Sequence, residues 1–134
     1  MFGKRDTSNI KTLIAKGTRI NGDLMFEDGL RVDGEVHGAI RAESEGASLL
    51  VISEGAVADG GLEADHVIIN GTVKGPVEAR GLLELQANAR IEGDVHYSTL
   101  EMHQGARIMG QLRPIESEAA REDKSIFRLA SKTA

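Results

Sequence analysis

The sequence predicts an all-β fold, a single β-helix or β-solenoid of about six stacked coils, and three observations predict it. Apolar or glycine residues alternate with polar residues over long stretches of the chain. A short glycine-containing motif recurs at nearly regular intervals. Aliphatic residues are plentiful, whereas the 134 residues include only one Tyr, three Phe and no Trp. Such a core needs many small, repeated contacts rather than a few large aromatic anchors.

The alternation has a period of two, the pattern of strands with one buried face. It runs from Val32 to Ala42, from Val67 to Arg80 and from Leu83 to Tyr97. These runs exceed the usual strand length of about 5–6 residues. We therefore expect the chain to bend at the inward glycines, which tolerate the dihedral angles of a corner.

The recurring motif is a β-branched residue, a glycine about two positions later, and another aliphatic residue. Its copies begin at Ile20, Val36, Val57, Val73, Ile91 and Ile108. The spacings are 16, 21, 16, 18 and 17 residues, which suit one coil of a β-helix. The longest spacing contains the polar segment 43–48, which we interpret as a loop bulging from one coil. Stacked coils bury a continuous apolar column while their backbones hydrogen-bond to the coils on either side.

The pattern divides the chain into a core and two tails. The coils span residues 12–113, residues 1–11 form an N-terminal tail, and residues 114–134 form a flexible C-terminal tail. Pro114 suits the end of the last coil because it cannot donate a ladder hydrogen bond. A loose helical spacing from Ile115 to Ala130 leaves open a helix that caps this end. A β-sandwich also has alternating strands, but sandwiches rarely keep a fixed period.

Composition and charge exclude several classes of function. The formal net charge is −5 and no basic patch is present, which argues against nucleic-acid binding. No phosphate-binding loop is present, so we expect neither a nucleotide nor another cofactor. The absence of cysteine fits a reducing compartment. No segment approaches the roughly 20 apolar residues of a membrane-spanning helix, and the N-terminus does not read as a signal peptide. We therefore expect a cytoplasmic protein.

The two ends of such a solenoid expose unpaired backbone groups and apolar side chains, and such edges invite pairing with another chain. The end coils are no more polar than the middle, although soluble solenoids usually carry polar capping repeats. We therefore expect copies of the chain to stack end to end into a homopolymer. The predicted contact residues are Leu13, Ile14, Ile20 and Leu24 in the first coil and Leu100, Met102, Ile108 and Leu112 in the last.

Through this pattern the chain resembles the bactofilins, a family of bacterial cytoskeletal proteins. The resemblance covers residues 12–113, for instance at Val32–Gly38 and Val67–Gly75, and extends to the N-terminal residues 1–5. It implies a right-handed β-helix that forms nonpolar, nucleotide-independent filaments on the inner face of the cell membrane. It further implies a scaffold that positions cell-wall enzymes or polarity factors and so influences cell shape.

The resemblance marks residues 1–5 as a membrane-targeting segment, and its composition independently favours weak membrane binding. Met1 and Phe2 are worth roughly 1.5–3 kcal/mol each if fully buried. Lys4 and Arg5 add about 1 kcal/mol each near an anionic surface. One copy should therefore bind weakly, and a filament that displays many copies should bind strongly.

The alternatives to this function are a metal or catalytic site, an acyltransferase and an interaction domain. His37 and His96 occupy outward positions, His66 precedes a strand and His103 lies near a corner. No pair has the spacing of a zinc motif, so we predict neither a metal site nor a catalytic site. A hexapeptide-repeat acyltransferase needs a strict six-residue rhythm that is absent here, and His37 is its only defensible catalytic candidate. A β-helical interaction domain with covered ends stays open.

Overall fold

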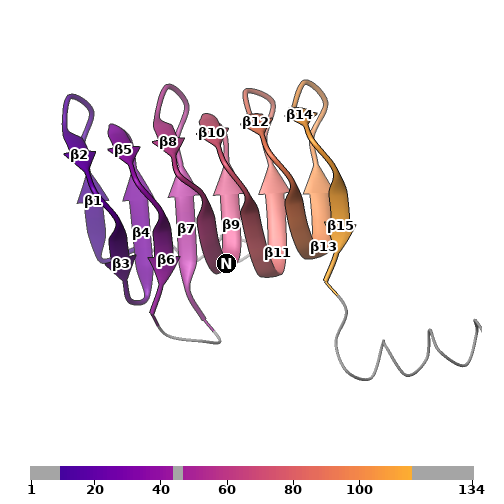
Figure 1. Ribbon diagram of the computed structural model, residues 1–134, viewed down its shortest axis with the longest axis horizontal. Helices are drawn as coiled ribbons and strands as arrows, with labels where there is room; N and C mark the ends of the chain where they lie inside the picture. Colours follow the sequence, from indigo (N-terminus) through magenta and orange to yellow (C-terminus); the bar gives the residue numbers. More distant parts are fainter. Residues whose placement is uncertain (1–9, 44–46, 116–134) are drawn as a thin grey trace, which may run out of the picture.

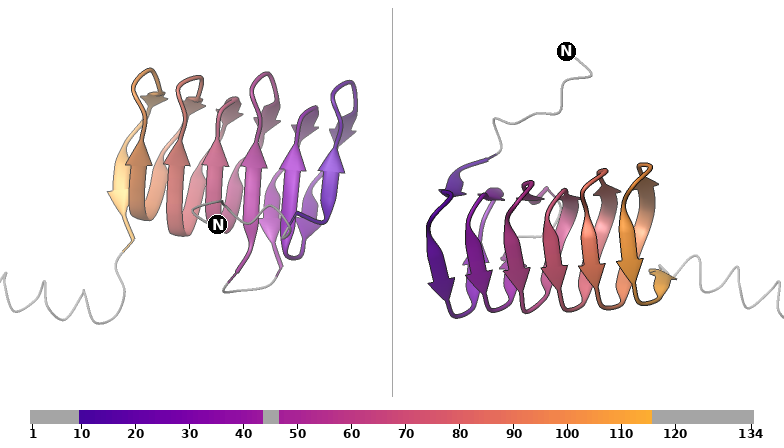
Figure 2. Two further views of the ribbon diagram at one scale, coloured as in Figure 1. Left: turned by 180° about the vertical axis from the view of Figure 1, so that it is seen from behind. Right: turned by 90° about the horizontal axis from the view of Figure 1, so that it is seen from above.

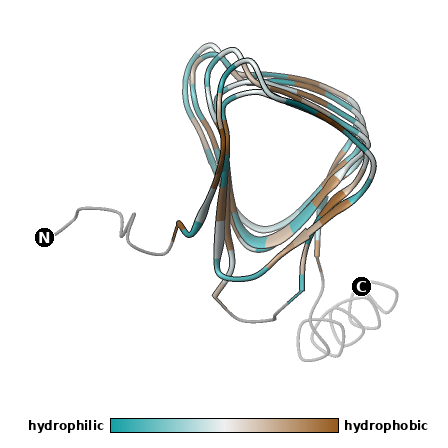
Figure 3. Ribbon diagram, turned by 90° about the vertical axis from the view of Figure 1, so that its left-hand side faces the viewer, coloured by the Kyte–Doolittle hydropathy of each residue, from teal (hydrophilic) through white to brown (hydrophobic). Residues whose placement is uncertain are grey.

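The computed structural model describes residues 10–43 and 47–115 as a solenoid of parallel strands with a triangular cross-section (Figures 1 and 3). Residues 1–9, 44–46 and 116–134 lie outside the described part. The predicted membrane-binding residues Met1, Phe2, Lys4 and Arg5 and most of the C-terminal tail therefore lie outside it as well.

Three faces make up the solenoid, and successive coils lie side by side along each of them (Figure 2). Face 1 contains β1 (Thr12–Ile14), β4 (Gly29–Val32), β7 (Leu49–Ile52) and the later halves of β9 (Leu62–Ile69), β11 (Val77–Leu85) and β13 (Val95–Met102). Face 2 contains β2 (Arg19–Asn21), β5 (Glu35–His37), β8 (Val57–Asp59), β10 (Thr72–Lys74), β12 (Arg90–Glu92) and β14 (Arg107–Met109). Face 3 contains β3 (Leu24–Phe26), β6 (Ile40–Ala42), the early halves of β9, β11 and β13, and β15 (Leu112–Pro114).

Each coil contributes one strand to face 2, which is a six-stranded sheet in the described residues. This confirms the prediction of about six coils. The predicted bends at glycines occur between faces 2 and 3, where each coil has a glycine of positive φ. At the corner between faces 3 and 1, β9, β11 and β13 instead bend within their strands, and β9 and β13 contain no glycine. The ladder of β11 with each neighbour shifts its register at this bend, between Ala79 and Leu82.

Inward side chains of successive coils stack into apolar columns that fill the interior. Because neighbouring strands pair in register, each inward residue lies between its counterparts in the adjacent coils. Face 1 contributes the column Leu30, Leu50, Val67 and Leu83, and face 2 contributes Val36, Ala58, Val73 and Ile91. The exposed fraction of each of these eight residues is 1% or less. Small and medium aliphatic residues therefore fill the space that a globular core gives to aromatic rings.

The corner between faces 2 and 3 is a stack of glycines, one from each coil, all with positive φ between 120° and 157°. They are Gly22, Gly38, Gly60, Gly75, Gly93 and Gly110. The N–H of Gly60 donates to the carbonyl of Lys74 in the next coil at 2.8 Å. A Cβ atom at Gly60 would lie 2.5 Å from the carbonyl oxygen of Gly38. The recurring glycine of the sequence motif is therefore required both by backbone conformation and by the close approach of the coils.

Two sequence expectations need correction. The third motif copy begins at Ala58 and not at Val57, because Ala58 pairs with Val36 and Val73 in the buried column. His66 lies within β9, paired with Leu49 and Leu82, and does not precede a strand. Pro114 ends the last coil as expected, since it is the last residue of β15, where it pairs with Tyr97. Proline is tolerated there because the N–H of Ile115 makes the hydrogen bond to Tyr97 and β15 is an edge strand.

The predicted loop at 43–48 is confirmed at its two borders. β6 ends at Ala42 and β7 begins at Leu49. At the same corner, the first coil turns with two residues, Glu27 and Asp28, and β9 turns without leaving its strand. The extra residues of this coil therefore account for its greater length.

Substitution of Gly60 by Ala should strongly destabilise the fold. We expect a loss of about 2–5 kcal/mol, because overpacking costs about 1–3 kcal/mol and an L-residue at positive φ costs about 1–2 kcal/mol. Urea denaturation followed by circular dichroism would measure it. Gly55→Ala is the matched control, because Gly55 also has positive φ but a Cβ there would have no atom within 4 Å. A loss as large at Gly55 as at Gly60 would contradict the steric argument.

Candidate assembly surfaces

The N-terminal end of the solenoid has one open edge on each of its three faces. In the described residues, β1, β2 and β3 pair only with β4, β5 and β6 of the second coil. Figure 3 looks onto this end. It contains a hollow of about 460 Å³ whose apolar lining comes from Ile14, Ile20, Leu24, Phe26 and Leu30. Unpaired strand edges around an apolar hollow form a surface that another chain could cover.

The C-terminal end is open in the same way, and two of its inward side chains are exposed. The later half of β13, together with β14 and β15, pairs only with the preceding coil in the described part of the chain. Met102 is 46% exposed and Leu112 is 44% exposed, although both continue inward columns, with Leu85 and Val95 respectively. These two side chains are exposed because no further coil of the described part of the chain lies over them.

The structure places seven of the eight predicted contact residues in inward columns at the two ends. They are Ile14, Ile20 and Leu24 at the N-terminal end and Leu100, Met102, Ile108 and Leu112 at the C-terminal end. Leu13 differs, because it pairs with the outward Arg31 and is 56% exposed on the outer surface of face 1. In a strand of three residues, the apolar pair Leu13–Ile14 does not reveal which side chain turns inward.

Sequence reasoning missed Gly22 as a feature of the N-terminal end. Every other glycine of the corner stack lies against the glycine corner of the preceding coil, whereas Gly22 faces open space. Its signal was present in the motif, since Gly22 follows Ile20 in the first copy. A subunit that continued the solenoid at this end would meet Gly22 at the same short distance.

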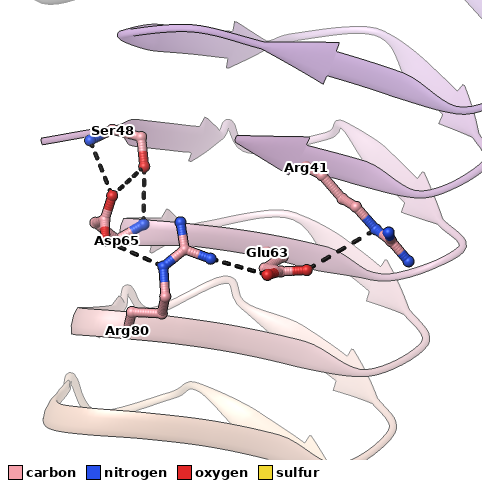
Figure 4. Close-up of polar contacts among 5 residues, drawn as sticks. All are labelled: Arg41, Ser48, Glu63, Asp65 and Arg80. Atoms are coloured by element: carbon pink, nitrogen blue, oxygen red, sulfur yellow. Dashed lines mark hydrogen bonds and ion pairs between the residues drawn. The ribbon is translucent and has the colours of Figure 1, made fainter. Parts of the chain in front are cut away.

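A polar network joins the coils beside the loop at 43–48 (Figure 4). The Ser48 hydroxyl donates to Asp65 Oδ2 at 2.7 Å, and the Asp65 N–H donates back to Ser48 Oγ at 2.9 Å. Arg80 Nε donates to Asp65 Oδ1 at 3.1 Å, and Arg80 Nη1 donates to Glu63 Oε2 at 2.9 Å. Arg41 Nε lies 3.8 Å from Glu63 Oε1. The network therefore links three successive coils at the point where the insertion interrupts the ladder.

The charge states of this network favour the folded protein. Burial alone would raise the pKa of the Asp65 carboxyl, but hydrogen bonds from Ser48 and Arg80 outweigh it and hold the pKa below its ordinary value. Burial likewise opposes the charge on Arg80, yet the hydrogen bond and charge of Asp65 raise the pKa of Arg80. Because the folded pKa of Asp65 is depressed, its contribution to stability is present above the unfolded pKa and is lost as the pH falls through the folded pKa.

Asp65→Asn should destabilise the fold at pH 7 by about 1–3 kcal/mol, the range for hydrogen bonds to charged groups. The difference from the unsubstituted protein should shrink below about pH 4, where Asp65 itself becomes protonated. Urea denaturation at a series of pH values would measure both effects. Asp59→Asn, at a half-exposed carboxylate on face 2, should change stability by less than about 0.5 kcal/mol at any pH. A constant Asp65→Asn deficit from pH 7 to pH 3 would contradict this account.

In the described residues, two groups of side chains bring a histidine close to carboxylates. Glu84, Glu101 and His103 converge on face 1, with ligand atoms within 4.8 Å of one another. Glu84 is largely buried and accepts a hydrogen bond from Gln86 at 3.2 Å.

His37 lies between Glu35 and Asp59 on face 2, at 3.1 Å and 3.7 Å, with each ring nitrogen directed at a different carboxylate. The hydrogen bond from His37 and the charge of Arg19 lower the pKa of Glu35. His37 is therefore part of the outer charge pattern of face 2.

The described residues contain no helix long and apolar enough to cross a membrane. Together, the in-register stacking and the two open ends define a class of protein, a β-solenoid suited to self-association. The family model described as "Bactofilin: Polymer-forming cytoskeletal" matches residues 12–113. The chain belongs to the bactofilin family, as the sequence pattern predicted.

One curated relative supports the same assignment. Bactofilin BacO of Myxococcus xanthus (strain DK1622) is 29% identical over 111 residues, which cover 83% of this chain and 85% of the relative. No solved structure matches the chain. Family membership makes this a polymer-forming cytoskeletal protein, and the matched range coincides with the coils.

Proposed function

We propose that the chain polymerises by end-to-end continuation of its solenoid, without nucleotide, into a filament that scaffolds other proteins and has no enzymatic role. The observation that carries this proposal is that both end coils keep the interior strand register and columns but, among the described residues, have a neighbour on one side alone. Stacking would pair these edges and cover Met102 and Leu112. The spacing of neighbouring strands, about 4.8 Å, sets how closely the two end coils approach.

The same proposal places the filaments on the inner face of the cell membrane, as peripheral scaffolds for cell-wall enzymes or polarity factors that influence cell shape. Its support is the composition of residues 1–5, which combine two apolar side chains with two cations. Because each copy binds weakly, polymerisation and membrane attachment should reinforce each other.

Leu112→Arg should abolish filaments by placing a charge on the C-terminal end. Burial of a leucine is worth about 1.5–3 kcal/mol, so the protein concentration needed for assembly should rise at least about tenfold. Gly22→Ala should block the N-terminal end, because the new Cβ would project toward the stacked coil. Negative-stain electron microscopy and sedimentation of the full-length protein without nucleotide or metal would measure assembly.

Met109→Arg and Met25→Arg are the matched controls for these end variants. Both methionines lie in end coils, at 72% and 63% exposure, but at outward positions. They should leave filaments intact. Uniform small particles of the unsubstituted protein at all concentrations would overturn the proposal and favour a β-helical interaction domain that does not polymerise.

Phe2→Ser should release filaments from membranes while leaving assembly intact. The loss of about 1.5–3 kcal/mol per copy should lower binding at least about tenfold. Co-sedimentation with vesicles that contain anionic lipid would measure it. Phe127→Ser removes the same side chain from the C-terminal tail and serves as the control. Undiminished sedimentation of Phe2→Ser filaments with vesicles would count against membrane binding through residues 1–5.

A further inference from the structure

The outer surface of face 1 brings two carboxylates and an imidazole together near the C-terminal end. Glu84 of β11 and Glu101 of β13 are register partners on neighbouring strands of coils five and six. His103 follows β13 two residues after Glu101, so both side chains lie on the outward side of the chain. One ligand atom from each of the three residues lies within 4.8 Å of the other two. A single ion between them could therefore contact all three side chains.

Burial sets the Glu84 carboxylate apart from the acidic side chains of a solvated surface. Glu84 is only 8% exposed. Gln86 Nε2 donates to Glu84 Oε2 at 3.2 Å, and His103 Nε2 lies 3.7 Å from the same oxygen. Buried charges in proteins are paired or coordinate metal ions, and hydrogen bonds from outer partners hold ligand atoms in place. Glu84 is therefore a fixed ligand, toward which the exposed Glu101 and His103 side chains can turn.

A second pair of facing glutamates shows how a cation compensates two neighbouring carboxylates. Glu63 and Glu78 are register partners on face 3, where Arg80 Nη1 lies 2.9 Å from Glu63 Oε2. Beside the face 1 pair the basic group is His103, whose imidazole is a cation only when protonated and binds metal ions when neutral. Like charges opposite each other on neighbouring strands are unfavourable. A divalent cation bound between the two face 1 carboxylates would make this contact favourable.

We propose that Glu84, Glu101 and His103 bind one divalent transition-metal ion, of which zinc is the type. Imidazole nitrogen together with carboxylate oxygen is a donor set that suits zinc, whereas calcium and magnesium prefer oxygen ligands throughout. Zinc bonds of about 2.0–2.2 Å place tetrahedral ligand atoms roughly 3.4 Å apart. The 3.7 Å between Glu84 and His103 is slightly longer, and rotation of the exposed side chains closes the difference. Three protein ligands leave the fourth position to water.

The histidine on face 2 lacks this geometry. Glu35 Oε1 lies 3.1 Å from His37 Nε2, and Asp59 Oδ2 lies 3.7 Å from His37 Nδ1. The two carboxylates therefore face different nitrogens of the ring, and an ion bound to one nitrogen is directed away from the second carboxylate. Within residues 10–43 and 47–115, the face 1 cluster is the group of three whose ligand atoms converge.

A bound ion joins the last two coils on face 1. Glu84 belongs to coil five, whereas Glu101 and His103 belong to coil six, which in the described residues has a neighbouring coil on one side alone. An ion that binds only the folded protein stabilises it, and the effect grows with the logarithm of the ion concentration. The site lies on the outer surface and does not depend on polymerisation. Histidine spacing in the sequence does not reveal it, because its ligands come from two coils and include a single histidine.

Zinc binding by the untagged, full-length protein tests the proposal. Equilibrium dialysis should give one zinc ion per chain, and zinc at about one hundred times its dissociation constant should raise Tm by at least about 5 °C. Calcium or magnesium at the same concentrations should change neither quantity. Absence of zinc binding up to about 1 mM would overturn the proposal. An equal rise of Tm with calcium would overturn the assignment to a transition metal.

Substitution of a ligand should weaken zinc binding, whereas substitution of the face 2 histidine should not. His103→Gln and Glu101→Gln should each raise the dissociation constant at least about tenfold, a loss that even partners outside the coordination sphere cause. Both side chains are exposed, so the metal-free variants should unfold at the same Tm as the unsubstituted protein. His37→Gln is the matched control, because His37 also lies beside two carboxylates. Unchanged zinc affinity in His103→Gln, or an equal loss in His37→Gln, would overturn the site.

Discussion

The close, in-register approach of successive coils at the glycine corner is the constraint on which the rest of the structure depends. Gly60 donates its N–H to the following coil and lies against Gly38 of the preceding one, where a Cβ atom would not fit. Every strand ladder inherits its spacing from these backbone hydrogen bonds. The apolar columns follow, because side chains held at one strand spacing can pack directly on their counterparts. Small aliphatic residues suit this regular packing better than aromatic rings.

The same constraint explains why the protein has two open ends. A column such as Val36, Ala58 and Val73 has no feature that ends it, and the end coils continue the interior pattern through Ile20 and Ile108. Within residues 10–43 and 47–115, the end coils therefore differ from the interior coils in lacking a neighbour on one side. Membership of a polymer-forming cytoskeletal family agrees with this geometry. A solenoid that assembles by continuation needs no separate binding site and no nucleotide, because the interaction at its ends is the one that holds its coils together.

Contacts on the outer surface stabilise the solenoid where an insertion interrupts the regular strand ladder. The insertion at 43–48 lengthens one coil, and hydrogen bonds among Ser48, Asp65 and Arg80 join the coils beside it. Elsewhere the outer surface carries mixed charges in close pairs, such as Arg31 beside Asp33 on face 1 and Arg19 beside Glu35 on face 2.

The sequence by itself determined the solenoid, its six coils, its interior columns and its family, because period-two alternation and a recurring glycine are local patterns. It did not determine register where local patterns are ambiguous. Val57 and Ala58 both suited the buried column, and only the pairing with Val36 and Val73 selected Ala58. Leu13 and Ile14 were equally suited to face inward until pairing with β4 placed Leu13 outside. The Asp65 network joins residues from different coils. Tertiary structure alone decided it, because the unequal lengths of the coils set which residues become neighbours.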